Sequence, residues 1–140
     1  MNVLTDFSGL NGLAIAAAAV ASHALGGMWF TVLFGKAYAR ALGRQDEPTV
    51  RPTAILFVGP FVCGLAITLT SALLIQALKI QSMANALAFG SVVGMGYLAS
   101  TTVCVAINPN IPRPLFYGLV SGSYFLLSSL LSCAILVAIK

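Results

Sequence analysis

Residues 53–78 read TAILFVGPFVCGLAITLTSALLIQAL, a run of 26 residues without a single charged side chain. A helix needs about 20 consecutive apolar residues to cross the roughly 30 Å hydrocarbon core of a bilayer. The run is continuous rather than alternating, and in lipid a helix satisfies its own backbone hydrogen bonds. This stretch therefore predicts a membrane-spanning helix rather than a strand of a membrane barrel.

Three more runs of this kind occupy most of the remaining chain, at residues 10–34, 83–107 and 115–139. None of them contains Asp, Glu, Lys or Arg. The connections after the second and third runs are short, so helices that follow one another are expected to be antiparallel neighbours. The sequence thus predicts an all-α fold, in which residues 1–140 form a single transmembrane domain of four antiparallel helices.

The composition excludes a soluble domain. Of the 140 residues, 59% are hydrophobic and only 7% are charged, and the mean hydropathy is +0.99. A globular domain is roughly a quarter charged, and disordered chains are still more polar. The three cysteines lie inside the apolar runs without C-x-x-C spacing, which argues against a disulfide framework or a zinc site. We expect them to be small packing residues.

The basic residues predict how the chain is oriented in the membrane. The connections after the first and third runs carry five of the seven, whereas Lys79 and Lys140 lie on the opposite side. Because cytoplasmic loops are enriched in Lys and Arg, residues 35–52 and 108–114 are expected in the cytoplasm and both termini outside. Aromatic residues do not interleave with these cations as in a base-stacking surface, so no nucleic-acid partner is expected.

Residues 35–47 include an amphipathic basic segment. Lys36, Arg40 and Arg44 recur every four residues, which would place them on one side of a helix lying on the membrane surface. Each cation near an anionic surface contributes about 1 kcal/mol, so membrane lipids with anionic headgroups are the expected partners. A simpler interpretation is that these charges only set the orientation of the chain in the membrane. The two interpretations do not exclude each other. The predicted headgroup contacts are Lys36, Arg40, Arg44, Arg51 and Arg113.

Small residues spaced four apart predict where the helices pack. Lipid offers no hydrophobic drive for helix association, so close approach of backbones at small residues has to supply it. A packing face left over after the bundle has formed would suit a homo-oligomer or another membrane protein. The predicted packing positions are Ser22, Gly26, Gly64, Gly90, Gly94, Gly118 and Gly122.

One polar site is predicted within the membrane. His23 lies near the middle of the first run, and polar side chains at that depth are candidates for function. Together with Asn85 and a kink at Pro60, His23 could line the path of a small-molecule transporter or pore. As a lone imidazole it could instead bind haem or another tetrapyrrole. A neutral histidine that bonds to an adjacent helix is a simpler interpretation.

The chemistry that the chain lacks limits its function. No second histidine accompanies His23, and the three acidic residues lie outside the apolar runs. A proton-coupled exporter would be expected to keep a carboxylate within a helix, and a Ser-His-Asp set cannot be assembled. We therefore expect no enzyme activity, no metal and no cofactor.

Several short motifs are spread over the chain: Gly27-Met28-Trp29-Phe30, Leu33-Phe34-Gly35-Lys36, Arg40-Ala41-Leu42-Gly43, Gly94-x-Gly96-Tyr97, Asn108, Phe116 and Tyr124. At these residues the sequence resembles the bacterial domain-of-unknown-function family 1761. The resemblance implies a small four-helix integral membrane protein with no established reaction. We expect this protein in the bacterial inner membrane, as a multi-pass protein. Our leading hypothesis is accordingly a multi-pass protein that acts by helix packing, as a homo-oligomer or accessory subunit in contact with anionic lipid.

Overall fold

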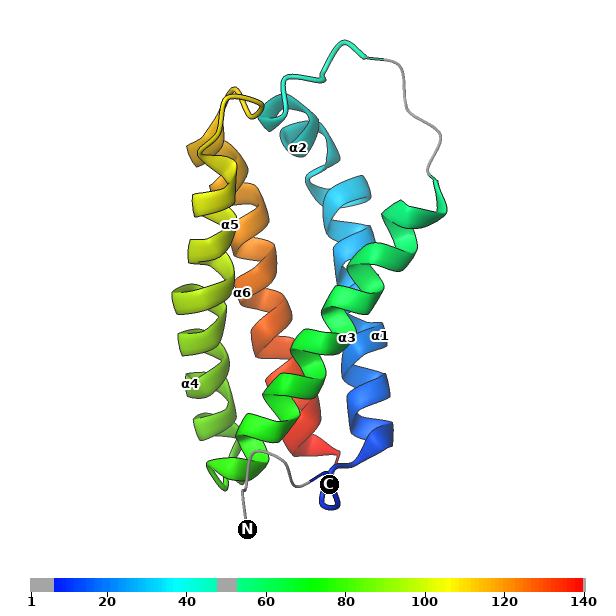
Figure 1. Cartoon of the computed structure of the whole chain (residues 1–140), viewed down its shortest axis with the longest axis vertical. Coiled ribbons are helices and arrows are strands. Elements are labelled where there is room, and N and C mark those ends of the chain that lie inside the picture. The colour runs from blue at the N-terminus through cyan, green and yellow to red at the C-terminus, as the bar shows by residue number, and fades with distance from the viewer. Residues whose placement is uncertain (1–6, 48–52, 140) are drawn as a thin grey trace.

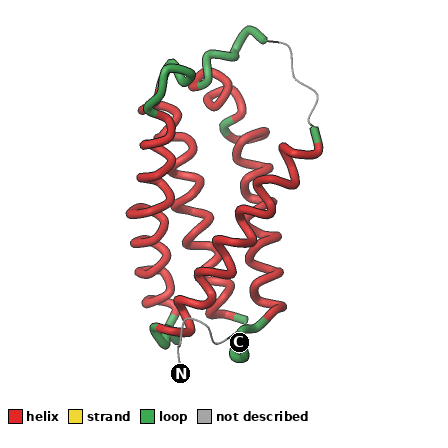
Figure 2. The backbone as a smooth tube through the Cα atoms, viewed as in Figure 1, coloured by secondary structure: helices red, strands yellow, loops and turns green. Residues whose placement is uncertain are grey.

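Four long helical spans make up the computed structural model, which describes residues 7–47 and 53–139. Figure 1 shows successive spans running up and down the long axis in turn, as short connections require. The described residues contain no strand, and only turns and loops separate the helices (Figure 2). All four spans are long and apolar enough to cross a membrane. The prediction of an all-helical membrane fold is confirmed.

The ends of the spans fall within two residues of the predicted runs. The described part of the connection after the first span contains an additional short helix, α2. The elements are α1 (Gly12–Met28), η2 (Trp29–Leu33), α2 (Gly35–Ala41), α3 (Ala54–Ala77), α4 (Met83–Val93), η3 (Gly94–Ala99), α5 (Ser100–Ala106) and α6 (Pro114–Ala138).

Local side-chain chemistry fixes where several helices begin. The Oδ1 atom of Asn11 accepts hydrogen bonds from the backbone N–H groups of Leu13 and Ala14, at 3.0 and 3.2 Å. Ser82 caps α4 in the same way. Pro114 is the first residue of α6, where its missing N–H removes no intrahelical bond.

The last span, α6, is the central helix of the bundle. It packs against α1 on one side and against α4, η3 and α5 on another. In contrast, α3 leans mainly on α1 and meets α6 only over a limited length, so it crosses the bundle obliquely (Figure 1). Ile55 near the start of α3 is 74% exposed, whereas Thr68 in its second half is 1% exposed. The first half of α3 therefore makes few contacts with the rest of the chain and is largely exposed.

Two spans contain π-helical turns, which hydropathy did not predict. In η2 the backbone N–H of Phe34 donates to the Trp29 carbonyl, five residues earlier, at 2.8 Å. In η3 the wide turn continues to Ser100, whose hydroxyl donates to the Met95 carbonyl at 2.8 Å. Such turns are rare and frequently occur at functional sites. Here they coincide with the Gly-Met-Trp-Phe and Gly-x-Gly-Tyr motifs.

The amphipathic segment is shorter than its charge pattern suggests, because the helix ends at Ala41. Gly43 then adopts a φ of +69°, a left-handed conformation that glycine takes without strain and that commonly ends a helix. A Cβ atom at this position would also lie 2.9 Å from Cγ of Pro112. Lys36 and Arg40 are thus on α2, while Arg44 lies beyond its end.

Candidate functional site

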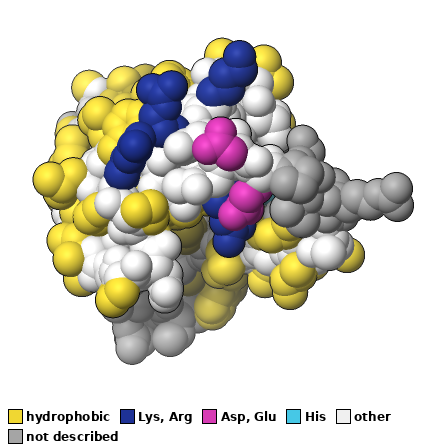
Figure 3. Space-filling model, turned by 90° about the horizontal axis from the view of Figure 1, so that it is seen from above, with side chains coloured by type: hydrophobic (Ala, Val, Ile, Leu, Met, Phe, Trp, Pro, Cys, Tyr) yellow, Lys and Arg dark blue, Asp and Glu magenta, His cyan; other side chains and the backbone are white. Residues whose placement is uncertain are grey.

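Four basic side chains gather at one end of the bundle, which we call the basic end: Lys36, Arg40, Arg44 and Arg113. The first two are four residues apart on α2, and all four are exposed. Figure 3 shows this end from above, with the Lys and Arg side chains spread over the surface around the acidic ones. The fifth predicted headgroup contact, Arg51, lies outside the described residues.

The charge at the basic end is only partly neutralised. Arg44 Nε lies 3.7 Å from Glu47 Oε2, and both side chains are largely exposed. An exposed ion pair of this kind contributes little to stability, and Asp46 is the other acidic side chain nearby. Four cations and two carboxylates leave a positive surface at the end of an apolar bundle.

Aromatic rings attach α2 to α6 beneath these cations. The ring centroids of Phe30 and Tyr38 are 4.8 Å apart, and those of Phe30 and Tyr124 are 5.0 Å apart. Tyr38 also lies 5.6 Å from the ring of Tyr117. Such pairs add roughly 0.5–1.5 kcal/mol beyond the area that they bury. They hold α2 in a fixed position, so that Lys36 and Arg40 remain on the outside.

Burial also affects the acidity of Tyr38. Desolvation, with a smaller contribution from the neighbouring Tyr117, raises the pKa of Tyr38 to about 12. The phenol is therefore neutral at physiological pH. It adds no negative charge to the basic end and remains a hydrogen-bonding group.

Trp29 has a role that the sequence did not reveal. Tryptophan is enriched at the membrane–water interface of membrane proteins, but the side chain of Trp29 is only 8% exposed and faces α6. The indole N–H donates a hydrogen bond to the Val120 carbonyl at 3.0 Å, and the ring lies 4.4 Å from that of Phe34. Trp29 thus joins the π-helical end of the first span to the central helix.

Hydroxyl groups make further polar contacts between spans. Ser22 and Ser132 share a hydrogen bond of 2.7 Å between their Oγ atoms. The Tyr124 hydroxyl donates to the Ser22 carbonyl at 3.2 Å, and Ser129 donates to the Gly90 carbonyl at 2.9 Å. Hydrogen bonds between membrane helices average about 0.6 kcal/mol each. Together they connect α6 to both of its neighbours.

Six of the seven predicted packing residues lie where helices touch. A Cβ atom at Gly90 would be 3.1 Å from the Ser129 carbonyl oxygen, so two backbones meet there directly. Gly64 on α3 differs, because a Cβ atom at this position would meet nothing within 4 Å. The residues in contact with other spans are Ser22, Gly26, Gly90, Gly94, Gly118 and Gly122.

The polar residues proposed for a transport path lie apart. His23 on α1 is half-buried, and its ring meets that of Phe61 edge to face at 5.3 Å. Asn85 is exposed in the first turn of α4, and Pro60 is exposed on α3, which continues through it as one helix. In the part of the chain that the structure describes, no three His, Cys, Asp or Glu side chains are grouped to hold a metal ion.

The surface of the described bundle is hollowed in several places, among them a groove and a cavity. A shallow groove of about 570 Å³ runs between the third span and α6, and Ser91, Met95 and Leu126 are among its lining residues. We call the end of the bundle where α1 begins and α6 ends the terminal end. A cavity of about 410 Å³ lies there. Neither hollow is lined by His23 or Pro60.

Comparison with known proteins gives one match. A family model described as "Protein of unknown function (DUF1761)" matches residues 13–137, which cover the four spans except for the first residue of the first span and the last residue of the last. No curated protein and no solved structure matches the chain. The π-helical turns, the buried Trp29 and the contacts around α6 all lie within the matched region.

Proposed function

This chain belongs to the DUF1761 family of proteins of unknown function, and from this premise we propose a role in the bacterial inner membrane. It is a multi-pass protein that acts by helix packing, as a homo-oligomer or accessory subunit. Anionic lipid headgroups at the basic end hold it in place. One observation carries this proposal: the bundle has a cationic surface at one end, and the first half of α3 is largely exposed.

The basic end supports contact with anionic lipid. Lys36 and Arg40 stand on a short helix that aromatic contacts fix to α6, and Arg113 precedes α6 directly. Fixed cations where an apolar bundle ends are positioned to meet headgroup phosphates. In this arrangement the basic end faces the cytoplasm and the terminal end faces outward, in line with the excess of basic residues in cytoplasmic loops.

The first half of α3 supports association with another helix. Its residues from Ala54 to Ala66 are exposed except for Gly59, Phe61 and Gly64, which are half-buried. Small side chains on this half, among them Gly59 and Cys63, allow a neighbouring backbone to approach. The proposed neighbour is α3 of a second copy or a span of another membrane protein.

The basic end is tested by the lipid preference of the triple variant Lys36→Gln/Arg40→Gln/Arg44→Gln. Native mass spectrometry of protein extracted from mixed phosphatidylglycerol and phosphatidylcholine vesicles measures which lipids remain bound. We expect the original chain to retain phosphatidylglycerol preferentially and the triple variant to lose roughly 3 kcal/mol of that preference, at about 1 kcal/mol per cation. The charge-preserving variant Lys36→Arg/Arg40→Lys/Arg44→Lys should keep it. Equal lipid preference in all three proteins would refute headgroup binding here.

Self-association is tested through the exposed thiol of Cys63 on α3. Oxidation of membranes that contain the protein should produce a disulfide-linked dimer if the first halves of two α3 helices meet. We expect Cys63→Ser to abolish the dimer and Cys104→Ser, which removes the exposed thiol of α5, to leave it unchanged. A dimer that persists without Cys63, or no dimer in the original chain, would argue against pairing through α3.

A further inference from the structure

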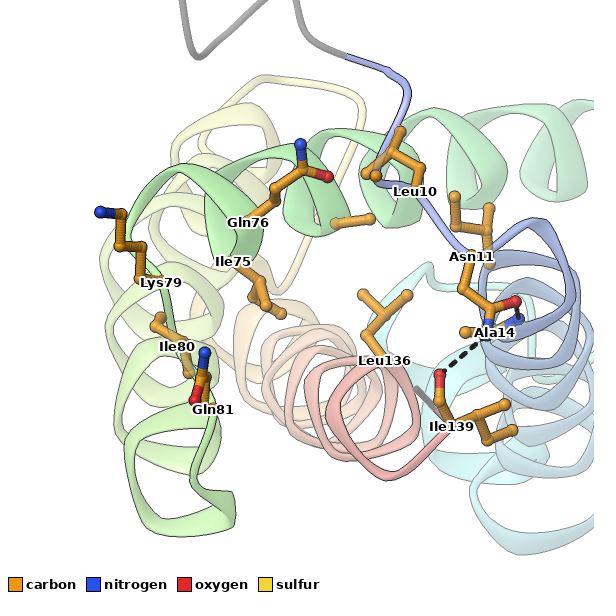
Figure 4. Close-up of a pocket in the computed structure, with 13 residues that line it drawn as sticks. Leu10, Asn11, Ala14, Ile75, Gln76, Lys79, Ile80, Gln81, Leu136 and Ile139 are labelled. Atoms are coloured by element: carbon orange, nitrogen blue, oxygen red, sulfur yellow. Dashed lines mark hydrogen bonds between the residues drawn. The ribbon is translucent and has the colours of Figure 1, made fainter.

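The cavity of about 410 Å³ at the terminal end is formed by three spans that are far apart in the sequence. It lies between the start of α1, the end of α3 and the end of α6 (Figure 4). Its apolar wall includes Ala14, Ala72, Ile75 and Leu136, which belong to the buried core of the bundle. Small alanine side chains on two of the spans leave space between the helix ends.

Asn11 holds the walls of this cavity together. Its Oδ1 atom caps α1, and its Nδ2 atom donates to the Ile139 carbonyl at 3.2 Å. One side chain thereby fixes the beginning of the first span against the end of the last, as the dashed lines in Figure 4 show. The cavity is thus bounded by connected helix ends, at a place where ends commonly fray.

The rim of the cavity is polar, in contrast to its wall. Figure 4 shows the Gln76 amide extending over the cavity, while the Lys79 ammonium lies at the outer edge and points away. Gln81 adds a second amide to the lining. None of the described lining residues carries a carboxylate. The rim therefore offers amide groups, which both donate and accept hydrogen bonds, and one positive charge at its outer edge, while the described lining provides no negative charge to pair with a cation.

The position of the cavity and the chemistry of its lining together indicate which kind of ligand it would bind. The cavity lies where four apolar helices end, so an acyl chain could reach its wall from the bilayer while its head stayed among the amides. Cavities of several hundred Å³ with an apolar wall and a few polar groups are typical of ligand sites. We propose that the terminal end binds one acyl chain of an amphiphile whose head carries acceptor oxygens and no positive charge. This site is separate from the basic end and from α3 pairing.

Photolabelling in phosphatidylcholine nanodiscs tests the proposal. Dodecanoate that carries a diazirine on its chain is compared with dodecyltrimethylammonium that carries the same diazirine. Labelled residues are identified by mass spectrometry. We expect dodecanoate to label the lining of the cavity, including Ile75, Ile80 and Leu136, and the cationic probe to label it about tenfold less. Equal labelling by both probes, or labels spread evenly over the lipid-facing surface, would overturn the proposal.

A matched pair of variants locates the label. Leu10 is half-buried and lines the cavity, so Leu10→Trp fills it from the rim without altering a helix interior. Leu13 lies one turn away, is 70% exposed and does not line the cavity. We expect Leu10→Trp to reduce dodecanoate labelling about tenfold and Leu13→Trp to leave it unchanged. Unchanged labelling in a folded Leu10→Trp protein would overturn the assignment, and circular dichroism verifies that both variants fold.

Two sources could supply such a chain, and a further probe distinguishes them. Phosphatidylglycerol with a diazirine on one acyl chain is added in place of dodecanoate. Labelling of the cavity by this lipid supports the site and identifies a membrane phospholipid as its occupant. Labelling by dodecanoate alone supports the site for a free single-chain amphiphile. Failure of both probes overturns the proposal and leaves the basic end unaffected.

Discussion

Gly90→Leu is expected to lower the free energy of unfolding by about 3 kcal/mol, the upper range for adding a side chain to a close-packed contact. A Cβ atom at Gly90 would lie 3.1 Å from the Ser129 carbonyl oxygen and 3.2 Å from Cα of Leu130. Both atoms belong to the backbone of α6, which cannot move aside without shifting the whole helix. The hydrogen bond from Ser129 to the Gly90 carbonyl would be lost as well. Unfolding in mixed micelles of increasing SDS content, followed by circular dichroism, measures the effect.

Gly96→Leu is the matched control for this substitution. Gly96 lies six residues further along the same span, and a Cβ atom there would meet nothing within 4 Å. The added side chain would face lipid, and leucine favours a helix over glycine by about 1 kcal/mol. We therefore expect Gly96→Leu to leave stability unchanged or slightly higher. Equal losses in both variants would show that the close approach of the third span to α6 does not limit stability.

Trp29→Ala is expected to cost about 3 kcal/mol of unfolding free energy, as truncation of a buried tryptophan typically does. The substitution removes the ring that packs on Phe34 and the hydrogen bond from the indole N–H to the Val120 carbonyl. Trp29→Phe should lose only about 1 kcal/mol, because a ring remains and only the hydrogen bond disappears. The same unfolding assay separates these contributions.

Phe57→Ala provides the comparison for the loss of an aromatic side chain. Phe57 lies in the exposed first half of α3, so its removal deletes few contacts within the chain. We expect the free energy of unfolding of Phe57→Ala to remain within about 0.5 kcal/mol of that of the original chain, as is usual for exposed positions. A loss as large as that of Trp29→Ala would mean that the first half of α3 is packed in the micelle.

The four spans could be predicted from sequence because their length and lack of charge leave only the bilayer as a surrounding. The arrangement of the spans could not, since all four are apolar on every side and show no amphipathic face that points inward. The central position of α6 depends on which of its serines and glycines contact other spans. Ser132 and Ser129 do so through hydrogen bonds. The first π-helical turn likewise begins at a residue with a tertiary contact, the hydrogen bond from Trp29 to the Val120 carbonyl, which no local pattern indicates.

Sequence patterns predicted the positions of candidate site residues correctly where residues close in sequence are also close in the structure. The spacing of Lys36 and Arg40 predicted their common side of α2, but Gly43 removed Arg44 from that helix. The terminal-end cavity was missed because its lining comes from segments as distant as Leu10, Ile75 and Ile139. No local pattern in the sequence connects those three segments.

The central position of α6 determines when this protein can assemble. A ribosome makes the chain from its N-terminal side onward, so the helix that touches both α1 and the third span is synthesised after both of them. Until it enters the bilayer, the third span has no principal partner, and the first has only α3. A polypeptide that stops before residue 114 would leave Trp29, Ser22 and Gly90 facing lipid. The native bundle therefore cannot assemble before α6 has been inserted.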